Sequence, residues 1–349
     1  MRRMIDEPWR ILWTVILAVA FLPGCDSPHD DPPEAPRVDH AQVEAALDAA
    51  ERYIALGNMV EAEAIAIRLS RLDPEHFAPD DLLGRICVGR ALAFNANGRE
   101  AEAGQAFSEA HDHYMEAVRK APGISGLQQS AGEIAQLAGR LDAAMKHFKA
   151  AAELSPEEPA PPLYIAQLLV AGGSPEEARP WVQKVLAIVP GQPHALATRA
   201  VLEMDLGNVS EAFEAIDSAR SALPVDVGIR VIEARLYRQH DDPERALELL
   251  LSLPRQQQAD EGVAGELAVN WGSIGRHDRS AETWAFCFAS MPDVHRSGRV
   301  ALRVAEAWIE DRQFEKAAVW IEQAELLGVP GEQVELVRVL AREAEESQD

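Results

Sequence analysis

Residues 193–226 read PHALATRAVLEMDLGNVSEAFEAIDSARSALPVD, a stretch of 34 residues in which two segments flank Gly207. Apolar residues recur at helical spacing on both sides of this glycine, and Pro224 stands near the end of the second segment. A proline has no N–H to donate within a helix, so it predicts a helix end. The stretch therefore predicts two antiparallel helices joined by a short turn.

The same unit recurs along the chain. Glycines occur at positions 57, 98, 139, 173, 207 and 275, separated by 41, 41, 34, 34 and twice 34 residues. The intermediate position falls on Asp241, within the turn-like sequence HDDPERAL. When this turn residue is numbered position 15 of each unit, the units begin near residues 43, 84, 125, 159, 193, 227, 261 and 298. A fixed period of this length predicts an array of stacked helix pairs.

Two positions of the unit carry small residues throughout. Position 8 holds Ala50, Ala91, Gly132, Ala166, Ala200, Ala234, Ala268 and Ala305, and position 20 holds Ala62, Ala103, Ala144, Ala178, Ala212, Ala246, Ser280 and Ala317. Antiparallel helices that approach closely need small residues at the contact, because larger ones would overpack it. Position 24 is bulky and apolar in seven of the eight units, as expected for a side chain that fills the space between helices.

This register resembles the tetratricopeptide repeat family, and the resemblance covers residues 43 to about 331. It implies an all-α fold, a solenoid of about eight helix-turn-helix repeats stacked in a right-handed superhelix. Residues 332–349, EQVELVRVLAREAEESQD, are apolar on one face and charged on the other. They are expected to form a C-terminal capping helix and tail.

Four departures from the period predict local irregularities. In the second unit Pro122 comes seven residues late, which predicts a second helix about two turns longer that protrudes from the array. Seven additional residues within EHFAPDDLLG are expected to lengthen the connection between the first two units. Pro180, inside the second helix of the fourth unit, predicts a kink. Pro254 and the following residues predict a short helix and a long loop.

The first 24 residues have the pattern of a secretory signal. Arg2, Arg3 and Arg10 precede the apolar run ILWTVILAVAFL, which is too short to span a bilayer as a helix. The junction Leu22-Pro23-Gly24-Cys25 resembles the lipobox of bacterial lipoproteins, which implies lipid attachment at Cys25. An uncleaved anchor helix over residues 9–24 and ordinary export are the alternatives.

Residues 25–42 are rich in proline and acid, which predicts an extended tether between an anchor and the folded part. Asp26 follows the cysteine directly, a position that favours retention in the inner membrane of enteric bacteria. The sequence leaves inner and outer membrane open. The expected location is the bacterial cell envelope, with the folded part facing the periplasm.

Charge and motif content exclude several classes of function. The formal net charge is −24, which disfavours nucleic acid as a partner because its phosphates are repelled. The three cysteines, Cys25, Cys87 and Cys287, are too few and too scattered for a disulfide framework or a zinc site. Cys87 and Cys287 are interpreted as small core residues.

Motifs for nucleotide binding, metal hydrolysis and serine nucleophiles are absent from the sequence. Glu109 and His113, four residues apart, are the nearest approach to a metal pair, and with His111 they are interpreted as an exposed polar face. We therefore predict no catalytic, cofactor-binding or metal-ligating residues and no enzymatic activity.

In the tetratricopeptide family the first helix of each repeat lines an inner groove, chiefly through positions 2, 5, 9 and 12. No unit combines Lys and Asn at positions 5 and 9, so the resemblance disfavours a carboxylate clamp for chaperone tails. The middle of the groove is apolar to neutral and is expected to receive an amphipathic helix or extended segment. The candidate groove residues are Glu133, Leu163, Gln167, Val170, Val201, Met204, Arg235 and Arg238.

Taken together, these features predict a lipid-anchored, non-catalytic scaffold that binds a protein or peptide and assists an envelope complex. An accessory subunit of an envelope enzyme and a self-associating structural protein remain alternatives. The sequence identifies neither the partner nor the oligomeric state.

Overall fold

The computed structural model describes residues 40–96, 99–292 and 296–347 of the 349-residue chain. The expected signal segment and most of the tether, including Cys25, lie outside the described residues. The described helices fall in one compact unit, Ala41–Asp349. Every regular element in these ranges is a helix.

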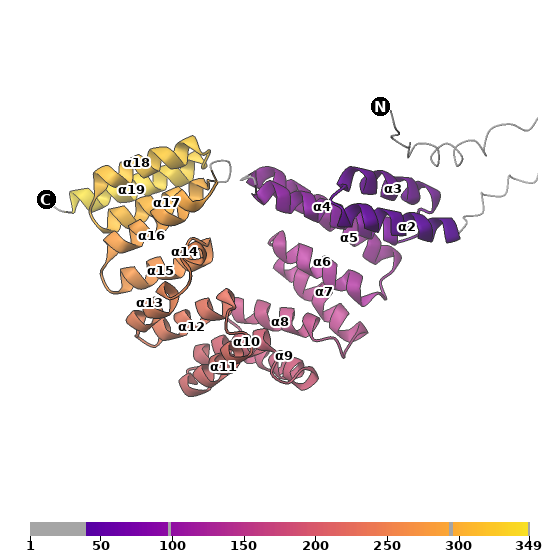
Figure 1. Ribbon diagram of the computed structural model, residues 1–349, viewed down its shortest axis with the longest axis horizontal. Helices are drawn as coiled ribbons and strands as arrows, with labels where there is room; N and C mark the ends of the chain where they lie inside the picture. Colours follow the sequence, from indigo (N-terminus) through magenta and orange to yellow (C-terminus); the bar gives the residue numbers. More distant parts are fainter. Residues whose placement is uncertain (1–39, 97–98, 293–295, 348–349) are drawn as a thin grey trace, which may run out of the picture. The chain divides into compact units, whose positions relative to one another are not determined.

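The helices form pairs, and each pair packs on the next (Figure 1). The first helices of the eight pairs are α2 (His40–Ala55), α4 (Ala78–Ala96), α6 (Ser125–Leu137), α8 (Ala160–Ala171), α10 (Pro193–Asp205), α12 (Val227–Gln239), α15 (Glu261–Ser273) and α17 (Gly298–Glu310). The second helices are α3 (Met59–Leu72), α5 (Glu100–Lys120), α7 (Leu141–Leu154), α9 (Pro175–Ile188), α11 (Val209–Ala222), α13 (Pro243–Leu251), α16 (His277–Ser290) and α18 (Phe314–Leu326). The short helix α14 (Arg255–Gln258) and the last helix, α19 (Gly331–Glu346), complete the described elements. The predicted all-α solenoid of helix pairs is confirmed.

The small residues lie where the helices of a pair touch. All residues at positions 8 and 20 are buried, and most are completely inaccessible to solvent. At Gly132, position 8 of the third unit, an added Cβ would lie 2.6 Å from Cε1 of Phe148, the position 24 residue of the same unit. Phe148 is fully buried, so the ring occupies the space that any side chain at position 132 would need.

In the seven pairs whose turn the structure describes at position 15, that residue has left-handed backbone. Gly173 and Gly207 have φ of 73° and 79°, and the same conformation recurs at Asp241 with φ 58°. Arg312, at position 15 of the eighth unit, has φ 59°. A side chain disfavours this conformation, so Asp241 and Arg312 hold the turn at a conformational cost that glycine does not have.

The second pair differs from the expected shape. The additional residues after α3 form the start of α4, which begins at Ala78, rather than a longer connection. Helix α5 has 21 residues against 14 in α7, α9 and α11, as predicted, but its added turns lie along those of α4 (Figure 1). Tyr114 of α5 packs so closely on Gly84 of α4 that a Cβ there would lie 2.9 Å from its ring.

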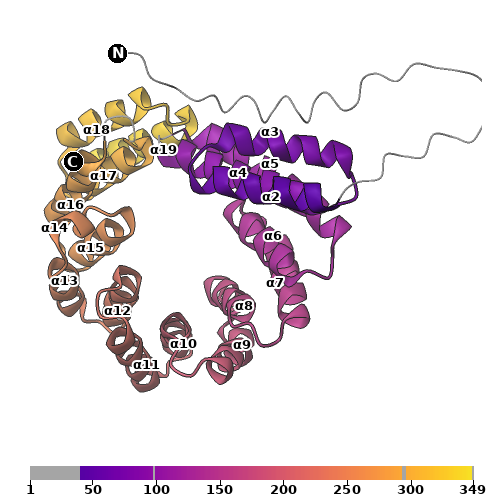
Figure 2. The same ribbon diagram turned by 45° about the vertical axis from the view of Figure 1, so that its right-hand side comes forward.

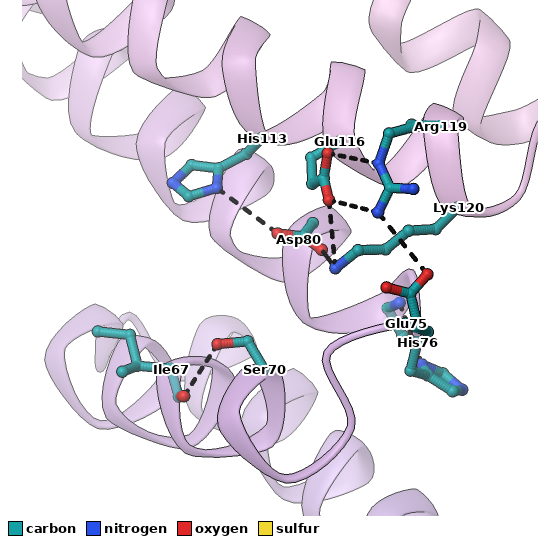
Figure 3. A network of polar contacts seen from close by, with 10 residues as sticks. Ile67, Ser70, Glu75, His76, Asp80, His113, Glu116, Arg119 and Lys120 are labelled. Atoms are coloured by element: carbon teal, nitrogen blue, oxygen red, sulfur yellow. Dashed lines mark hydrogen bonds and ion pairs between the residues drawn. The ribbon is translucent and has the colours of Figure 1, made fainter.

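A polar network holds the extended end of this pair together (Figure 3). Lys120, at the end of α5, binds the carboxylate of Asp80 near the start of α4 and lies 3.8 Å from Glu116. His113 is 4.0 Å from the other oxygen of Asp80, and Arg119 joins Glu116 to Glu75. The side chains of Lys120 and Asp80 are at least nine-tenths buried, so breaking the pair would leave an uncompensated charge.

The fourth and sixth units also depart from the regular repeat. Pro180 lies inside α9, and this helix runs without interruption from Pro175 to Ile188. Helix α13 has only 9 residues, as the early Pro254 predicts, and the segment that follows contains α14. Gln258 of α14 donates to the carbonyls of Leu251 and Leu253, which fixes this segment against the end of α13.

Candidate protein-binding surface

The first helices α6, α8, α10, α12, α15 and α17 follow one another along one side of the array, and the second helices lie on the other side (Figure 2). Neighbouring first helices touch directly from α8 to α15. Positions 2, 5, 9 and 12 of these helices form the surface called here the inner face. It has two parts of different character, the middle segment on α6, α8 and α10, and a hollow that begins at α12.

In the middle segment, side chains of the chain itself fill much of the surface. Leu163, predicted as a groove residue, is only 9% exposed and packs with Val185 and Ala195. Glu133 is half-buried and accepts a hydrogen bond from Gln129 at 2.9 Å. Burial, together with the nearby Glu133 carboxylate, raises the pKa of Tyr164 to about 12, so this hydroxyl stays neutral.

The remaining middle residues are half-buried. Gln167, Val170, Val201 and Met204 share this intermediate exposure. Val170 packs on the core cluster that contains Ala166, and Met204 on the cluster that contains Ala200. These side chains are therefore partly committed to packing between repeats.

Arg235 and Arg238 both lie beside one acidic residue of the next unit. Arg235 donates to Oε1 of Glu266 at 2.9 and 2.7 Å, and Arg238 is 3.6 Å from Oε2. Glu266 is only 8% exposed, so the two guanidinium groups compensate a buried carboxylate. This junction joins α12 to α15.

Beside Glu266 the surface opens into a hollow of about 980 Å³, formed by α12, α15, α16 and α17. This C-terminal hollow is lined by Arg235, Glu261, Gly262, Gly265, Glu266, Ala268, Val269, Gly272, His277, Ser280, Trp284, Arg299, Arg303, Glu306, Ala307 and Glu310.

The floor of the C-terminal hollow is the inner face of α15, which is almost free of side chains. Positions 2, 5 and 12 of this helix are Gly262, Gly265 and Gly272, and position 9 is Val269, 49% exposed. A Cβ at Gly265 would stand 3.5 Å from Cη2 of Trp284, which is ordinary contact. Glycine at this position thus leaves the edge of the Trp284 ring open to the hollow.

The walls of the hollow carry pairs of polar side chains, two of which are arginine–glutamate ion pairs. Arg299 lies 3.3 Å from Glu261, Arg303 lies 2.9 Å from Glu306, and Nδ1 of His277 lies 3.0 Å from Glu310. The side chains of Arg299, Arg303, Glu261 and Glu310 are exposed, and those of His277 and Glu306 are about one-third exposed. Ion pairs that solvent reaches contribute only about 0–1 kcal/mol each. A ligand could therefore exchange them for its own charged groups at small cost.

Of the residues that line the hollow, the predicted groove contained only Arg235, and the open floor of α15 was not predicted. The sequence nevertheless contains a sign of the hollow, because the inner positions of the seventh unit are three glycines and a valine. Glycine is unfavourable inside a helix by about 1 kcal/mol relative to alanine, so three on one helical face are a departure from good helix composition.

The other residues singled out for chemistry occupy structural positions. Cys87 and Cys287 are buried, and burial raises the pKa of both thiols, that of Cys287 to about 11. His111 is only 7% exposed, so the expectation that it belongs to an exposed face is wrong. Glu109 accepts from Gln105 and lies 3.8 Å from Arg90, while His113 faces Asp80.

In the described ranges no three His, Cys, Asp or Glu side chains gather as metal ligands would. None of the helices that the structure describes is both long enough and apolar enough to cross a lipid bilayer.

Comparison with protein families places residues 135–202 in the tetratricopeptide repeat. Comparison with curated proteins finds no match. The matched stretch begins in α6 and ends in α10.

Several solved structures share this fold. A tetratricopeptide repeat protein from Parabacteroides merdae ATCC 43184 is 18% identical, with a TM-score of 0.51 over 74% of this chain and 98% of its own. PilF from Pseudomonas aeruginosa is 16% identical, with a TM-score of 0.50 over 66% and 98% of the two chains. PilW, a type IV pilus biogenesis factor, is 18% identical, with a TM-score of 0.50 over 65% and 97%. At these identities the likeness concerns the fold alone.

Proposed function

The chain is a tetratricopeptide-repeat protein, and we propose that it is a non-catalytic scaffold that holds a segment of a partner protein in the C-terminal hollow. The observation that carries this proposal is the side-chain-free floor of α15 at Gly262, Gly265 and Gly272. Because no side chains stand at these three positions, the main chain of a partner can approach the helix closely there.

The chemistry of the hollow suits a peptide with both apolar and charged residues. Trp284 and Val269 offer apolar contacts on the floor, and a buried aromatic ring is a frequent anchor of interfaces. The paired arginines and glutamates of the wall offer donors and acceptors at the rim. The partner segment is therefore expected to place an apolar side chain against Trp284 and charged side chains beside Arg299 and Glu306.

Filling the hollow is the experiment that tests this proposal. The full chain would be used as bait on native envelopes solubilised in detergent, beside a Gly265→Leu, Gly272→Leu variant. A Cβ at either site makes only ordinary contacts, at 3.5 and 3.9 Å, so this variant should fold. Gly126→Leu, at inner position 2 of α6 where a Cβ meets nothing within 4 Å, is the matched control.

A stoichiometric partner retained by the wild type and by Gly126→Leu, and lost by the filled variant, is the expected result. Retention of the same partner by the filled variant would contradict the assignment of the hollow. A bait with Val170→Asp and Met204→Asp tests the middle segment in the same experiment, and we expect it to retain the partner.

We propose further that Cys25 carries a lipid that anchors the protein in the bacterial cell envelope, where it assists assembly of an envelope complex. The lipobox-like junction and the acidic, proline-rich stretch of residues 25–42 support this placement. The likeness in fold to PilW, itself a pilus biogenesis factor, is in keeping with such a role.

The anchor has its own test. Cys25→Ser should abolish incorporation of radiolabelled palmitate and move the protein from the membrane fraction to the soluble periplasmic fraction. Unchanged palmitate labelling of this variant would reject lipid attachment at Cys25, whatever the outcome for the hollow.

A further inference from the structure

A polar groove of about 380 Å³ is formed by α9, α10 and α11. Its polar lining consists of Arg179, Gln183, Arg199, Glu203, Asn208 and Glu211. The inner positions 2, 5, 9 and 12 of α10 do not line this α10 groove. The α10 groove is therefore separate from the inner face and from the C-terminal hollow.

Glu203 holds a place in the repeat that is apolar in every other unit. It stands at position 11, which is tyrosine, phenylalanine, tryptophan, leucine or alanine in the other seven units, with Leu169 and Tyr237 in the units on either side. Glu203 is only 7% exposed. A buried carboxylate is unfavourable unless other groups compensate it, so the fifth unit gives up an apolar contact for a charge at this groove.

The chain compensates one oxygen of this carboxylate. Nη2 of Arg179 donates to Oε2 of Glu203 at 3.2 Å, and Nδ2 of Asn208 donates to the same oxygen at 2.7 Å. Oε1 has no donor among the residues that the structure describes. Glu203 can therefore accept a further hydrogen bond from a ligand in the α10 groove.

Two charged side chains of the groove lack partners. Arg199 and Glu203 are four residues apart on α10, which places them on the same face of the helix. Arg199 is exposed and has no hydrogen bond or ion pair with any residue in the described ranges. The same holds for Glu211, which α11 contributes to the groove. The groove thus presents a cation and an anion that are both available to a ligand.

The remaining lining of the groove is apolar. Val182 and Leu202 are buried, and the half-buried Leu186 packs beside them in the same core cluster. An aliphatic group of a ligand can therefore contact Leu186 and exclude water from the bottom of the groove.

The charges of the groove restrict the class of ligand. An anion would lie near the carboxylates of Glu203 and Glu211, and a cation would lie near the guanidinium groups of Arg179 and Arg199. A molecule that carries one charge of each sign can pair with both sets. Small-molecule sites are commonly clefts of about 300–1,000 Å³, and the α10 groove has a volume in this range.

We infer that the α10 groove binds a free α-amino acid with a branched aliphatic side chain. The ammonium group of the amino acid donates to Oε1 of Glu203 and to Glu211. Its carboxylate accepts from Arg199, because a guanidinium group can bind a carboxylate through two parallel N–H bonds. Its side chain packs on Leu186. Binding joins α10 to α11 and should stabilise the folded chain.

Titration calorimetry of the full chain in detergent tests this inference, with L-leucine as the probe. Two analogues each lack one charge: 4-methylpentanoate has no ammonium group, and 3-methylbutylamine has no carboxylate. L-leucine should bind the wild type and raise its unfolding temperature. Each analogue should bind more weakly by about tenfold or more, because one ion pair is lost.

Single substitutions test the two unpaired charges. Arg199→Gln and Glu211→Gln should each weaken L-leucine binding by about tenfold or more. Both side chains are exposed, so both variants should unfold at the wild-type temperature in the absence of ligand. Arg68→Gln, at an exposed arginine of α3, is the control and should bind L-leucine as the wild type does.

A double variant tests the buried carboxylate without leaving a charge unpaired. Arg179→Met with Glu203→Leu introduces the residues that Met145 and Leu169 provide at the same positions of other units. Apolar residues often replace a buried ion pair without loss of stability, so this variant should fold and lose L-leucine binding.

Three results would overturn the inference. They are the absence of L-leucine binding by the wild type, equal binding of L-leucine and its two analogues, and undiminished L-leucine binding by Arg199→Gln or by the folded double variant. None of these results bears on the C-terminal hollow, whose residues are unchanged in every variant.

Discussion

The middle segment and the C-terminal hollow lie at equivalent positions of different repeats, yet the middle segment is filled by side chains and the hollow is open. Position 5 is Leu163 in α8, where it packs into the core, and Gly265 in α15, where it uncovers Trp284. The backbone arrangement is shared, so the volume of side chains at positions 5 and 12 determines whether the inner face can receive a ligand. A repeat array can thus place a binding site by substitution alone.

Two glycines show the same contrast at the level of single atoms. Gly132 in α6 is glycine because Phe148 fills the adjacent space, whereas a Cβ at Gly265 would meet only the edge of Trp284 at ordinary distance. The first glycine serves packing, and the second costs stability without a packing reason. The predictions below test this difference, beginning with the largest expected effect.

Gly132→Val should lower the free energy of unfolding by about 2–3 kcal/mol, because the side chain overpacks against Phe148. Urea denaturation of the variant and the wild type measures the difference. Gly126→Val on the same helix, where a Cβ meets nothing within 4 Å, is the control and should change stability far less. A Gly132→Val protein as stable as this control would show that Phe148 can move aside.

Arg312→Gly should raise the free energy of unfolding by about 1 kcal/mol, because glycine relieves the left-handed conformation in the turn between α17 and α18. The reciprocal change is Gly173→Ala in the turn between α8 and α9, where φ is 73°. It should lower the free energy of unfolding by a similar amount. Thermal unfolding of the two variants provides the comparison. A stabilising Gly173→Ala would be inconsistent with the turn described here.

Gly265→Ala should stabilise the protein by about 0.5–1 kcal/mol, because alanine is the better helix former and its methyl group fits. The same substitution should weaken partner binding, since the methyl group stands on the floor of the hollow. Urea denaturation measures the stability of the variant, and a pull-down with the same protein preparation measures partner binding. Loss of both together would indicate that Gly265 is required for folding, as Gly132 is.

The smallest effect concerns pH and arises between α5 and α7, away from the hollow. His147 is buried and hydrogen-bonded to Gln128 at 2.8 Å, and His111 is buried nearby. Burial lowers the pKa of both rings below the usual 6.5, and the positive charges of Lys146 and Arg140 act in the same direction, while Asp112 opposes them at His111.

Near the usual pKa of 6.5, both rings therefore hold fewer protons in the folded chain than in the unfolded chain. The stability they contribute is complete above the usual pKa and declines as the pH falls below it. The urea midpoint should be lower at pH 5.5 than at pH 7.5. In the His111→Gln, His147→Gln double variant, the urea midpoint should change less between pH 7.5 and pH 5.5. An unchanged pH dependence in this variant would show that other titratable groups cause it.

Much of the fold could be predicted because positions 8 and 20 require a small residue and position 15 favours a residue that accepts left-handed backbone. Asp241 was identified as a turn in place of glycine, and its φ is positive as that identification requires. The long α5 could be predicted from the late proline. The extension of α4 could not, because a segment that contains Pro79 resembles a loop until Asp80 meets Lys120.

The binding surface was harder to predict from the sequence, because the burial of its side chains depends on residues distant in the chain. Leu163 fits an inner position, but Val185 and Ala195 enclose it. Arg235 was expected at the edge of the groove, and its partner Glu266 lies 31 residues further on. The hollow exists because Gly262, Gly265 and Gly272 have no side chains. A search of the sequence for reactive or ligand-binding groups does not detect such a site.

The central claim is that the partner lies over α15 and not over α8 and α10. A photoreactive benzoylphenylalanine at Val269 or, in a second strain, at Val170 would be activated by light in cells that produce the full chain at native level. We predict a discrete cross-linked partner from position 269, lost when Gly265 and Gly272 are both leucine, and none from position 170. A cross-link from position 170 with none from position 269 would contradict the account and return the binding site to the middle segment.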